Sequence, residues 1–111
     1  MQQTYEVAIV GAGPIGLELA AELTRAGIDY VQFDKGTIGQ TMYWWPPQTQ
    51  WFSSNERIAI AGVPLLTVDQ RKATREEYLA YLRTISRTFD LKIRTHEPVV
   101  DITRDGDVFT L

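Results

Sequence analysis

Three glycines and one aspartate near the start of the chain have the types and the spacing of a dinucleotide-binding site. The motif Gly11-x-Gly13-x-x-Gly16 follows an apolar run and opens a helical pattern, and Asp34 closes the next apolar run. In such a motif the first glycine permits a tight turn, the second lets the backbone approach a pyrophosphate, and the third lets helix and strand pack closely. Phosphates then lie against the free N–H groups and the positive dipole end of the helix. The pattern predicts a pyrophosphate site in this loop.

Asp34 indicates which nucleotide is expected, and Lys35 and Pro14 complete the pattern. The carboxylate of Asp34 can accept hydrogen bonds from a ribose hydroxyl, and its charge disfavours a 2′-phosphate, so FAD or NAD is expected here in preference to NADP. Lys35 follows directly and is either a phosphate ligand or a solvated side chain. Pro14 suits the first position of the helix because its missing N–H is not needed there.

The elements that must position this site form a β-α-β unit. Residues 5–10 are a short, β-branched apolar run typical of a buried parallel strand, and residues 30–33 form a second one. The stretch between them is predicted to be a helix that ends at Gly27, where a C-terminal cap glycine belongs. Its expected buried face consists of Ile15, Leu19, Ala20 and Leu23.

Residues 36–73 are different in character, since they are rich in Gly and Pro and contain all three Trp residues. A loop of this length in a compact domain is usually functional or poorly ordered, and its aromatic density argues against disorder. We expect residues 58–60 to form a short extended piece. An NAD-type unit normally reaches its third strand after a short loop and helix, so the long insertion favours FAD. Each aromatic side chain could equally belong to the core or to an interface, but the group favours a wall beside a flat ring system.

The last third of the chain predicts a helix followed by strands. Thr74 and Glu77 have the spacing of a capping box, and helical periodicity follows over residues 75–88. Residues 91–95 are predicted to be a third strand. Two more strands, 98–103 and 108–111, are expected to flank a turn at residues 104–107. The predicted fold is a Rossmann-like, FAD-binding half-domain of the α/β class, with a central parallel sheet and a small antiparallel extension.

Composition excludes several other classes of protein. The chain has 111 residues, enough for one small domain, and no cysteine, which rules out a disulfide framework, a Cys-ligated metal site and a CxxC redox pair within it. Its net charge of −3 does not suggest a nucleic-acid or anionic-membrane surface. No apolar run approaches the roughly 20 residues needed to span a bilayer. We expect a cytoplasmic protein with no nucleic-acid or membrane partner.

The remaining candidate residues have simpler explanations. His96 is the single histidine and lacks a Ser, Cys or carboxylate partner at a motif spacing. The acids Glu76 and Glu77 suit a helix N-terminus. The three aspartates around the last turn are typical turn residues without the spacing of a calcium loop; they are Asp101, Asp105 and Asp107. No catalytic residue and no metal site is predicted.

The combined pattern resembles the N-terminus of the bacillithiol disulfide reductase group, which are thioredoxin-reductase-like FAD and NADPH enzymes. Class B flavin monooxygenases share the wider pattern, and the resemblance covers nearly the whole chain. The stretches that carry it are GxGPxG at 11–16, Asp34-Lys35-Gly36, Tyr43-x-x-Pro46, Trp51-Phe52-Ser53-Ser54, residues 71–84, and residues 99–109. The resemblance implies that the backbone of Val99 lies beside the adenine. The expected cofactor-binding residues are Gly11, Gly13, Pro14, Ile15, Gly16, Asp34, Lys35, Thr41, Tyr43, Phe52, Ser53 and Val99.

Two departures from the group limit what the resemblance implies. The group typically carries a cysteine inside the motif where Ile15 stands here, and this puts disulfide reductase activity in doubt. Members of the group are also several times longer, with a second GxGxxG domain for NAD(P)H and a return segment that completes the FAD site. We therefore expect this chain to be a truncated FAD-binding domain that is inactive alone.

Three functions stay open at this point. The first is the FAD-binding portion of an NAD(P)H-dependent oxidoreductase, in which hydride passes from nicotinamide to flavin and on to a disulfide or another acceptor. The second is part of a flavin-dependent monooxygenase. The third is a non-catalytic dinucleotide-binding module. Because the last strand stops at Leu111, an unpaired sheet edge is also expected to favour self-association.

Overall fold

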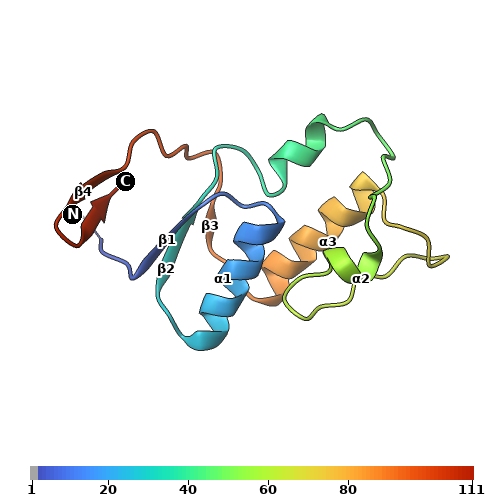
Figure 1. The fold of residues 1–111 in the computed structure, drawn as a ribbon, viewed down its shortest axis with the longest axis horizontal. Helices are drawn as coiled ribbons and strands as arrows, with labels where there is room; N and C mark the ends of the chain where they lie inside the picture. Colours follow the sequence, from blue (N-terminus) through green and yellow to red (C-terminus); the bar gives the residue numbers. More distant parts are fainter. Residues whose placement is uncertain (1–2) are drawn as a thin grey trace.

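The computed structural model describes residues 3–111, and its centre is a three-stranded parallel sheet. Figure 1 shows two long helices beside this sheet and a small hairpin at the opposite end of an elongated molecule, where residues 3–6 and 107–111 line the same hollow. The elements are β1 (Val7–Val10), α1 (Pro14–Ala26), β2 (Tyr30–Phe33), η1 (Gln40–Trp44), α2 (Asn55–Ile58), α3 (Arg75–Thr88), β3 (Ile93–Arg94), β4 (Thr103–Asp105) and β5 (Val108–Thr110). The predicted α/β class, with a parallel sheet and a small antiparallel extension, is confirmed.

The β-α-β unit forms as the sequence predicts. Strands β1 and β2 pair in parallel from Val7 with Tyr30 to Val10 with Phe33, and β3 extends the sheet on the other side of β2. Helix α1 ends at Gly27, which has a left-handed backbone (φ 70°). Its N–H and that of Ile28 bond to carbonyls of the last helical turn, so this glycine caps the helix as expected.

The predicted buried face of α1 is only half right. Ala20 and Leu23 are buried, but Ile15 is 86% exposed and Leu19 is 44% exposed. The helix lies between the sheet and α3, so its buried surface is rotated toward both neighbours, and Leu17 and Ala21 are buried as well. The sequence pattern does not reveal that second neighbour, which is why the predicted stripe was displaced.

Among residues 3–111, helix α3 contributes more buried residues to the main core cluster than any other element. Its buried residues Tyr78, Tyr81, Leu82 and Ile85 pack against side chains of the long segment between β2 and α3. This segment packs into the core, in agreement with the aromatic density that argues against disorder. A capping box starts α3, since Thr74 Oγ1 accepts from the backbone N–H of Glu77 at 3.2 Å.

One prediction in the middle of the chain needs correction. Residues 58–60 do not form an extended piece, because Ile58 is the last residue of α2 and Ile60 lies in an irregular loop. Local helical hydrogen bonds to the carbonyls of Ser54 and Asn55 outweigh the β-branched character of Ile58. The Ile60 N–H then bonds to the hydroxyl of Tyr81 at 2.8 Å, which satisfies the loop backbone without a strand partner.

The strands after α3 are shorter than predicted. The third strand covers only Ile93–Arg94, and residues 98–102 are not a strand. The hairpin pairs Thr103–Asp105 with Val108–Thr110 around a two-residue turn, in which Gly106 has φ 62°. Asp105 is therefore part of a strand, because glycine with positive φ allows a tighter connection than the predicted four-residue turn. Within residues 3–111 no helix has the length and apolar character that crossing a membrane requires.

Candidate dinucleotide-binding groove

The glycine loop between β1 and α1 shows why each glycine is needed. The N–H of Gly11 donates to the carbonyl of Phe33 at 2.7 Å, and its φ of 119° is a conformation that suits glycine. A Cβ on Gly16 would lie 2.5 Å from the carbonyl oxygen of Gly11, so only glycine lets α1 approach the loop this closely. Apart from its two chain neighbours, a Cβ on Gly13 would meet no atom of residues 3–111 within 4 Å. The backbone at Gly13 therefore faces open space, where a ligand can approach it.

The start of α1 is open toward the same space. Pro14 occupies the beginning of the helix, Gly13 caps it without a side-chain hydrogen bond, and the first turn carries no acidic residue. The first N–H groups of a helix have no partner within it, and together with the helix dipole they favour an anion. The loop geometry and the helix terminus thus offer the donors that a pyrophosphate needs.

Asp34 joins the glycine loop to the loop after β2. Its Oδ2 accepts from the N–H of Ala12 at 2.7 Å, and its Oδ1 accepts from the N–H of Gly36 at 2.8 Å. An ionised carboxylate has about four acceptor positions. Two of these positions accept from the protein backbone, so Asp34 helps to build the loop. The remaining acceptor capacity is of the kind that ligand hydroxyl groups require.

Gln32 is a site residue that sequence reasoning missed. It is fully buried on β2, and its Nε2 donates to the carbonyl oxygen of Gly11 at 3.0 Å. Its Oε1 is buried without a hydrogen-bond partner among residues 3–111. The signal was present in the sequence, since a polar side chain in the middle of a buried parallel strand requires a reason. Its role is to hold the first glycine carbonyl beneath α1.

A groove of about 590 Å³ runs along this loop, within the usual size range of cofactor pockets. It brings together seven of the residues predicted from the sequence, which are Gly11, Gly13, Pro14, Asp34, Lys35, Thr41 and Val99. It also contains Trp44, Trp45 and Trp51, which were expected there only as part of an aromatic wall, and residues that were not predicted, including Gln40, Met42 and Glu97. One side is therefore the glycine loop with its acid, and another is a wall of indole rings.

Five predicted residues lie outside the groove. Gly16 packs behind the loop, and Ile15 points away from it on the exposed side of α1. Tyr43 and Phe52 are also exposed, at 45% and 93%, and neither they nor Ser53 line the groove. The Phe52 ring instead lies 5.6 Å from the ammonium of Lys72. Contact of these side chains with a flavin stays a prediction.

A larger hollow of about 730 Å³ lies on the other face of the sheet, next to the hairpin. It is lined by side chains such as Val31 and Phe33, which alternate with Gln32 along β2 and so point away from α1. It contains neither the glycine loop nor Asp34. Size alone therefore does not identify the site, and the smaller groove carries the chemistry.

The start of α3 holds the indole wall in place. The Arg75 guanidinium donates to the carbonyl of Trp45 at 2.7 Å and to that of Tyr43 at 3.2 Å. The backbone N–H of Arg75 donates to Thr49, and the N–H of Trp51 donates to Ala73. Contacts between residues about 30 positions apart thus anchor the aromatic segment.

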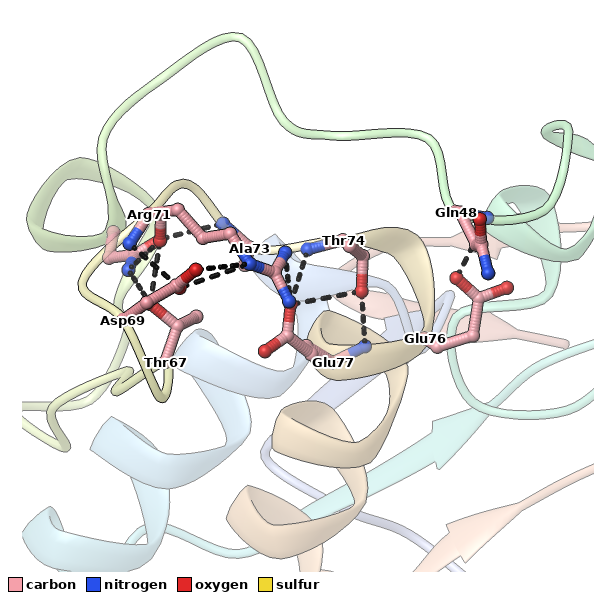
Figure 2. Close-up of polar contacts among 9 residues, drawn as sticks. Gln48, Thr67, Asp69, Arg71, Ala73, Thr74, Glu76 and Glu77 are labelled. Carbon is pink, nitrogen blue, oxygen red and sulfur yellow. Dashed lines mark hydrogen bonds and ion pairs between the residues drawn. The ribbon is translucent and has the colours of Figure 1, made fainter.

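Figure 2 shows further contacts at the same helix end. The backbone N–H of Gln48 donates to Glu76 Oε1 at 2.9 Å, and Glu77 accepts from the backbone N–H of Thr74 and from Arg71. Hydrogen bonds from its own backbone N–H, and then from Arg75 and Gln48, lower the pKa of Glu76. The capping acids therefore act on structure, as the sequence predicts.

The segment after β3 brings Val99 to the groove. The N–H of His96 donates to the carbonyl of Gly36, and the N–H of Glu97 donates to that of Asp34, both at 3.0 Å. These bonds lay the chain across the end of β2, beside the acid. The His96 side chain is exposed and its residue has φ 57°, so its part here is that of a backbone connection.

The pyridine nucleotide-disulphide oxidoreductase family model matches residues 8–111, which include the glycine loop, the acid and the indole wall. The chain belongs to this family. A family of this kind implies a flavin-binding domain, and the glycine loop, open helix start and acid fit the phosphates and ribose of such a cofactor.

Named relatives agree with that assignment. The bacilliredoxin reductase Bdr of Bacillus subtilis is 36% identical over 77 residues, which cover 69% of this chain and 24% of that protein. The structure of the bacillithiol disulfide reductase Bdr from Staphylococcus aureus superimposes with a TM-score of 0.90 and 31% identity, over 97% of this chain and 33% of that one. The chain thus spans about a third of the length of this solved relative.

A flavin-containing monooxygenase from Stenotrophomonas maltophilia shares the fold. Its TM-score is 0.88 over 97% of this chain and 33% of that one, at 24% identity. A reductase and a monooxygenase thus share the architecture of this chain over about a third of their own length. The fold alone therefore does not distinguish a reductase from a monooxygenase.

Proposed function

We propose that this chain is the N-terminal portion of the FAD-binding domain of an NAD(P)H-dependent flavin oxidoreductase. The observation that carries the proposal is the groove, in which an open helix N-terminus, a backbone without side chain at Gly13 and a carboxylate at Asp34 face one space. This donor and acceptor set matches a pyrophosphate flanked by a ribose. The indole wall adds a flat apolar surface, which favours FAD over NAD.

The proposed roles follow from position along the groove. The N–H groups around Gly13 and Pro14 would bind the pyrophosphate, and the remaining acceptor positions of Asp34 would bind ribose hydroxyls. The backbone of Val99 would lie beside the adenine. Thr41 would lie on the flavin side, next to the indoles. When bound, FAD supplies the hydride-accepting chemistry, and these residues bind and orient it.

In the whole enzyme, hydride from NAD(P)H would reach the flavin and then a disulfide or another acceptor. The relatives named as disulfide and bacilliredoxin reductases support this proposal. The nicotinamide site would lie in a second domain outside this chain, and the chain alone would be inactive.

The direct test is cofactor binding by the purified chain, measured by visible absorbance and by titration with FAD, NAD and NADP. We expect FAD to bind and to co-elute with the protein in gel filtration. We expect NADP to bind more weakly because the charge of Asp34 disfavours a 2′-phosphate. A chain that binds NAD but not FAD would contradict the proposal. Gly13→Ala is the matched variant. Its Cβ meets nothing in the protein beyond its chain neighbours, so it should weaken FAD binding without changing the fold.

A flavin-dependent monooxygenase is the second candidate. Ile15 stands in the motif where the reductase group typically carries a cysteine, and the monooxygenase fold matches almost as well as the reductase fold. In the full-length protein, reduction of a disulfide by NAD(P)H without oxygen consumption would support the reductase. NADPH-dependent oxygen uptake would support the monooxygenase. A module that holds nucleotide and does neither, even within its full-length protein, would be a non-catalytic binder.

Self-association through exposed strands is a separate proposal. The hairpin strands β4 and β5 are exposed, and β1 and β3 are the edges of the parallel sheet within residues 3–111. Unpaired edges can template pairing with another chain. Light scattering at increasing concentration tests this, and a constant monomer mass would contradict it.

A further inference from the structure

A line of aromatic side chains leads from the groove into the core. Trp45 and Trp51 both line the groove, and their rings meet edge to face with centres 5.1 Å apart. The ring of Trp51 lies 4.6 Å from that of Tyr78, which lies 5.5 Å from that of Tyr81. Both tyrosines are buried. Four rings are thus in continuous contact from the groove wall to the inside of α3.

The two tyrosines are poor electron donors in this setting. A phenol that loses an electron must also release its hydroxyl proton, so it needs a base nearby. The Tyr78 hydroxyl donates to the carbonyl of Ile58 at 2.8 Å, and that of Tyr81 to the carbonyl of Val63 at 2.6 Å. A peptide carbonyl is a very weak base, and burial raises the pKa of both phenols. An indole that has been oxidised at the groove therefore does not take an electron from either tyrosine.

The indoles have the opposite property. An indole can lose an electron first and its proton later, so no base has to be present. Trp51 Nε1 is buried and has no hydrogen-bond partner among residues 3–111. An oxidised Trp51 would therefore keep its Nε1 proton. Return of the electron would restore the neutral indole without any proton transfer. The pair Trp45 and Trp51 is thus suited to a fast and reversible loss of one electron.

We propose that Trp45 and Trp51 are a one-electron donor pair that quenches a light-excited flavin held in the groove. This inference rests on the proposed function, since the flavin is the acceptor. One indole gives one electron to the excited ring, no bond forms or breaks, and no proton moves. The same electron then returns to the indole, so the absorbed energy ends as heat. The wall protects the bound cofactor from light-driven side reactions.

The test is time-resolved fluorescence of flavin bound to the full chain, compared with Trp45→Phe and Trp51→Phe. Phenylalanine keeps an aromatic ring in contact but is far harder to oxidise. We expect each variant to lengthen the flavin lifetime several-fold and the double variant to lengthen it most. Transient absorption of the wild type should show the protonated indole radical and no tyrosyl radical. Unchanged lifetimes in both single variants and the double variant would overturn the proposal.

Control variants separate the competing explanations. Tyr81→Phe should leave the lifetime unchanged, because Tyr81 lies at the far end of the series. Trp44 also lines the groove and is 82% exposed. If Trp44→Phe lengthens the lifetime and the other two variants do not, the donor is the exposed indole and the proposed pair is wrong.

A second experiment tests the donor pair if a Trp→Phe variant does not fold. Incorporation of 5-fluorotryptophan into the Trp44→Phe chain makes both remaining groove indoles harder to oxidise with little change of shape, and should lengthen the lifetime. Visible absorbance reports flavin binding separately. A wild-type chain that binds no flavin overturns this inference and the proposed function together. Bound flavin whose lifetime ignores both fluorination and mutation overturns the donor pair alone.

Discussion

The two sides of the groove are built by different rules. The glycine loop and the Asp34 carboxylate are bonded chiefly to residues of one β-α-β unit and the turn after it, and bonds such as Gly11 N–H to the Phe33 carbonyl follow from strand pairing. The indole wall is held instead from a distance, by Arg75 and the backbone at the start of α3. The loop is thus fixed by local sequence, and the wall depends on a helix that begins about 30 residues later. Substitutions on the two sides should therefore have different effects on stability, FAD binding and susceptibility to proteolysis.

Gly16→Val should have the largest effect. Its Cβ would lie 2.5 Å from the Gly11 carbonyl oxygen, so α1 must move away from the loop. We expect a loss of about 3 kcal/mol in the free energy of unfolding, together with loss of FAD binding. Urea denaturation and absorbance titration measure the two quantities. Gly13→Ala is the control, because it should weaken FAD binding while the unfolding midpoint stays unchanged; equal destabilisation by both would contradict this view of the loop.

Arg75→Ala should release the indole wall. The guanidinium side chain is 16% exposed and donates to two carbonyls, so its removal should cost about 2 kcal/mol. Limited proteolysis should then cut within residues 36–73 while the β-α-β unit survives. Arg83→Ala, an exposed arginine on the same helix, should leave the digestion pattern unchanged. If both variants are cut alike, the wall is not anchored through Arg75.

Alkaline pH should destabilise the core that supports the wall. Burial raises the pKa of Tyr78 above its ordinary value of about 10. The unfolded state then loses this proton more easily, so the stabilisation is fully present below about pH 10 and is lost as the pH rises above it. Tyr78→Phe should cost about 1 kcal/mol at neutral pH through the hydrogen bond to Ile58. It should also flatten the alkaline decline in stability, whereas Tyr43→Phe, at an exposed position, should keep it.

Gln32→Leu should have the smallest effect on stability. It removes the bond to the Gly11 carbonyl, but also the buried Oε1 that has no partner among residues 3–111. The two changes should nearly cancel in the free energy of unfolding. FAD affinity should fall by about 3-fold to 10-fold, because the loop is less firmly held. A large loss of stability with unchanged affinity would show that Gln32 supports the core and does not position the loop.

The same contrast explains how much the sequence could predict. The glycine spacing, the acid after β2 and the capping box at Thr74 are local patterns, and the structure has all of them. The packing of the aromatic segment depends on which of two neighbouring side chains, Trp51 or Phe52, points into the core. Trp51 packs against Tyr78 while its neighbour Phe52 points to solvent, and this follows from the bond of the Trp51 N–H to Ala73. No short-range pattern contains that information, so Phe52 was expected at the groove and Trp51 was expected only as one of its group.

Helix α1 gives a second example. Leu17 is buried although it was not part of the predicted apolar face, and Ile15, which was, is exposed. Periodicity predicts that a helix has a buried face, but the direction of that face is set by neighbours that fold from distant sequence. Predictions about this family from sequence are therefore safest at the glycine loop.

Titration of the purified chain with FAD, with Gly13→Ala and Gly16→Val in parallel, tests the central claim most directly. The account predicts saturable FAD binding with a shifted visible spectrum, weaker binding by Gly13→Ala at unchanged stability, and loss of both binding and stability in Gly16→Val. Binding of FAD that is equally tight in wild type and Gly13→Ala would contradict the assignment of the groove to the cofactor.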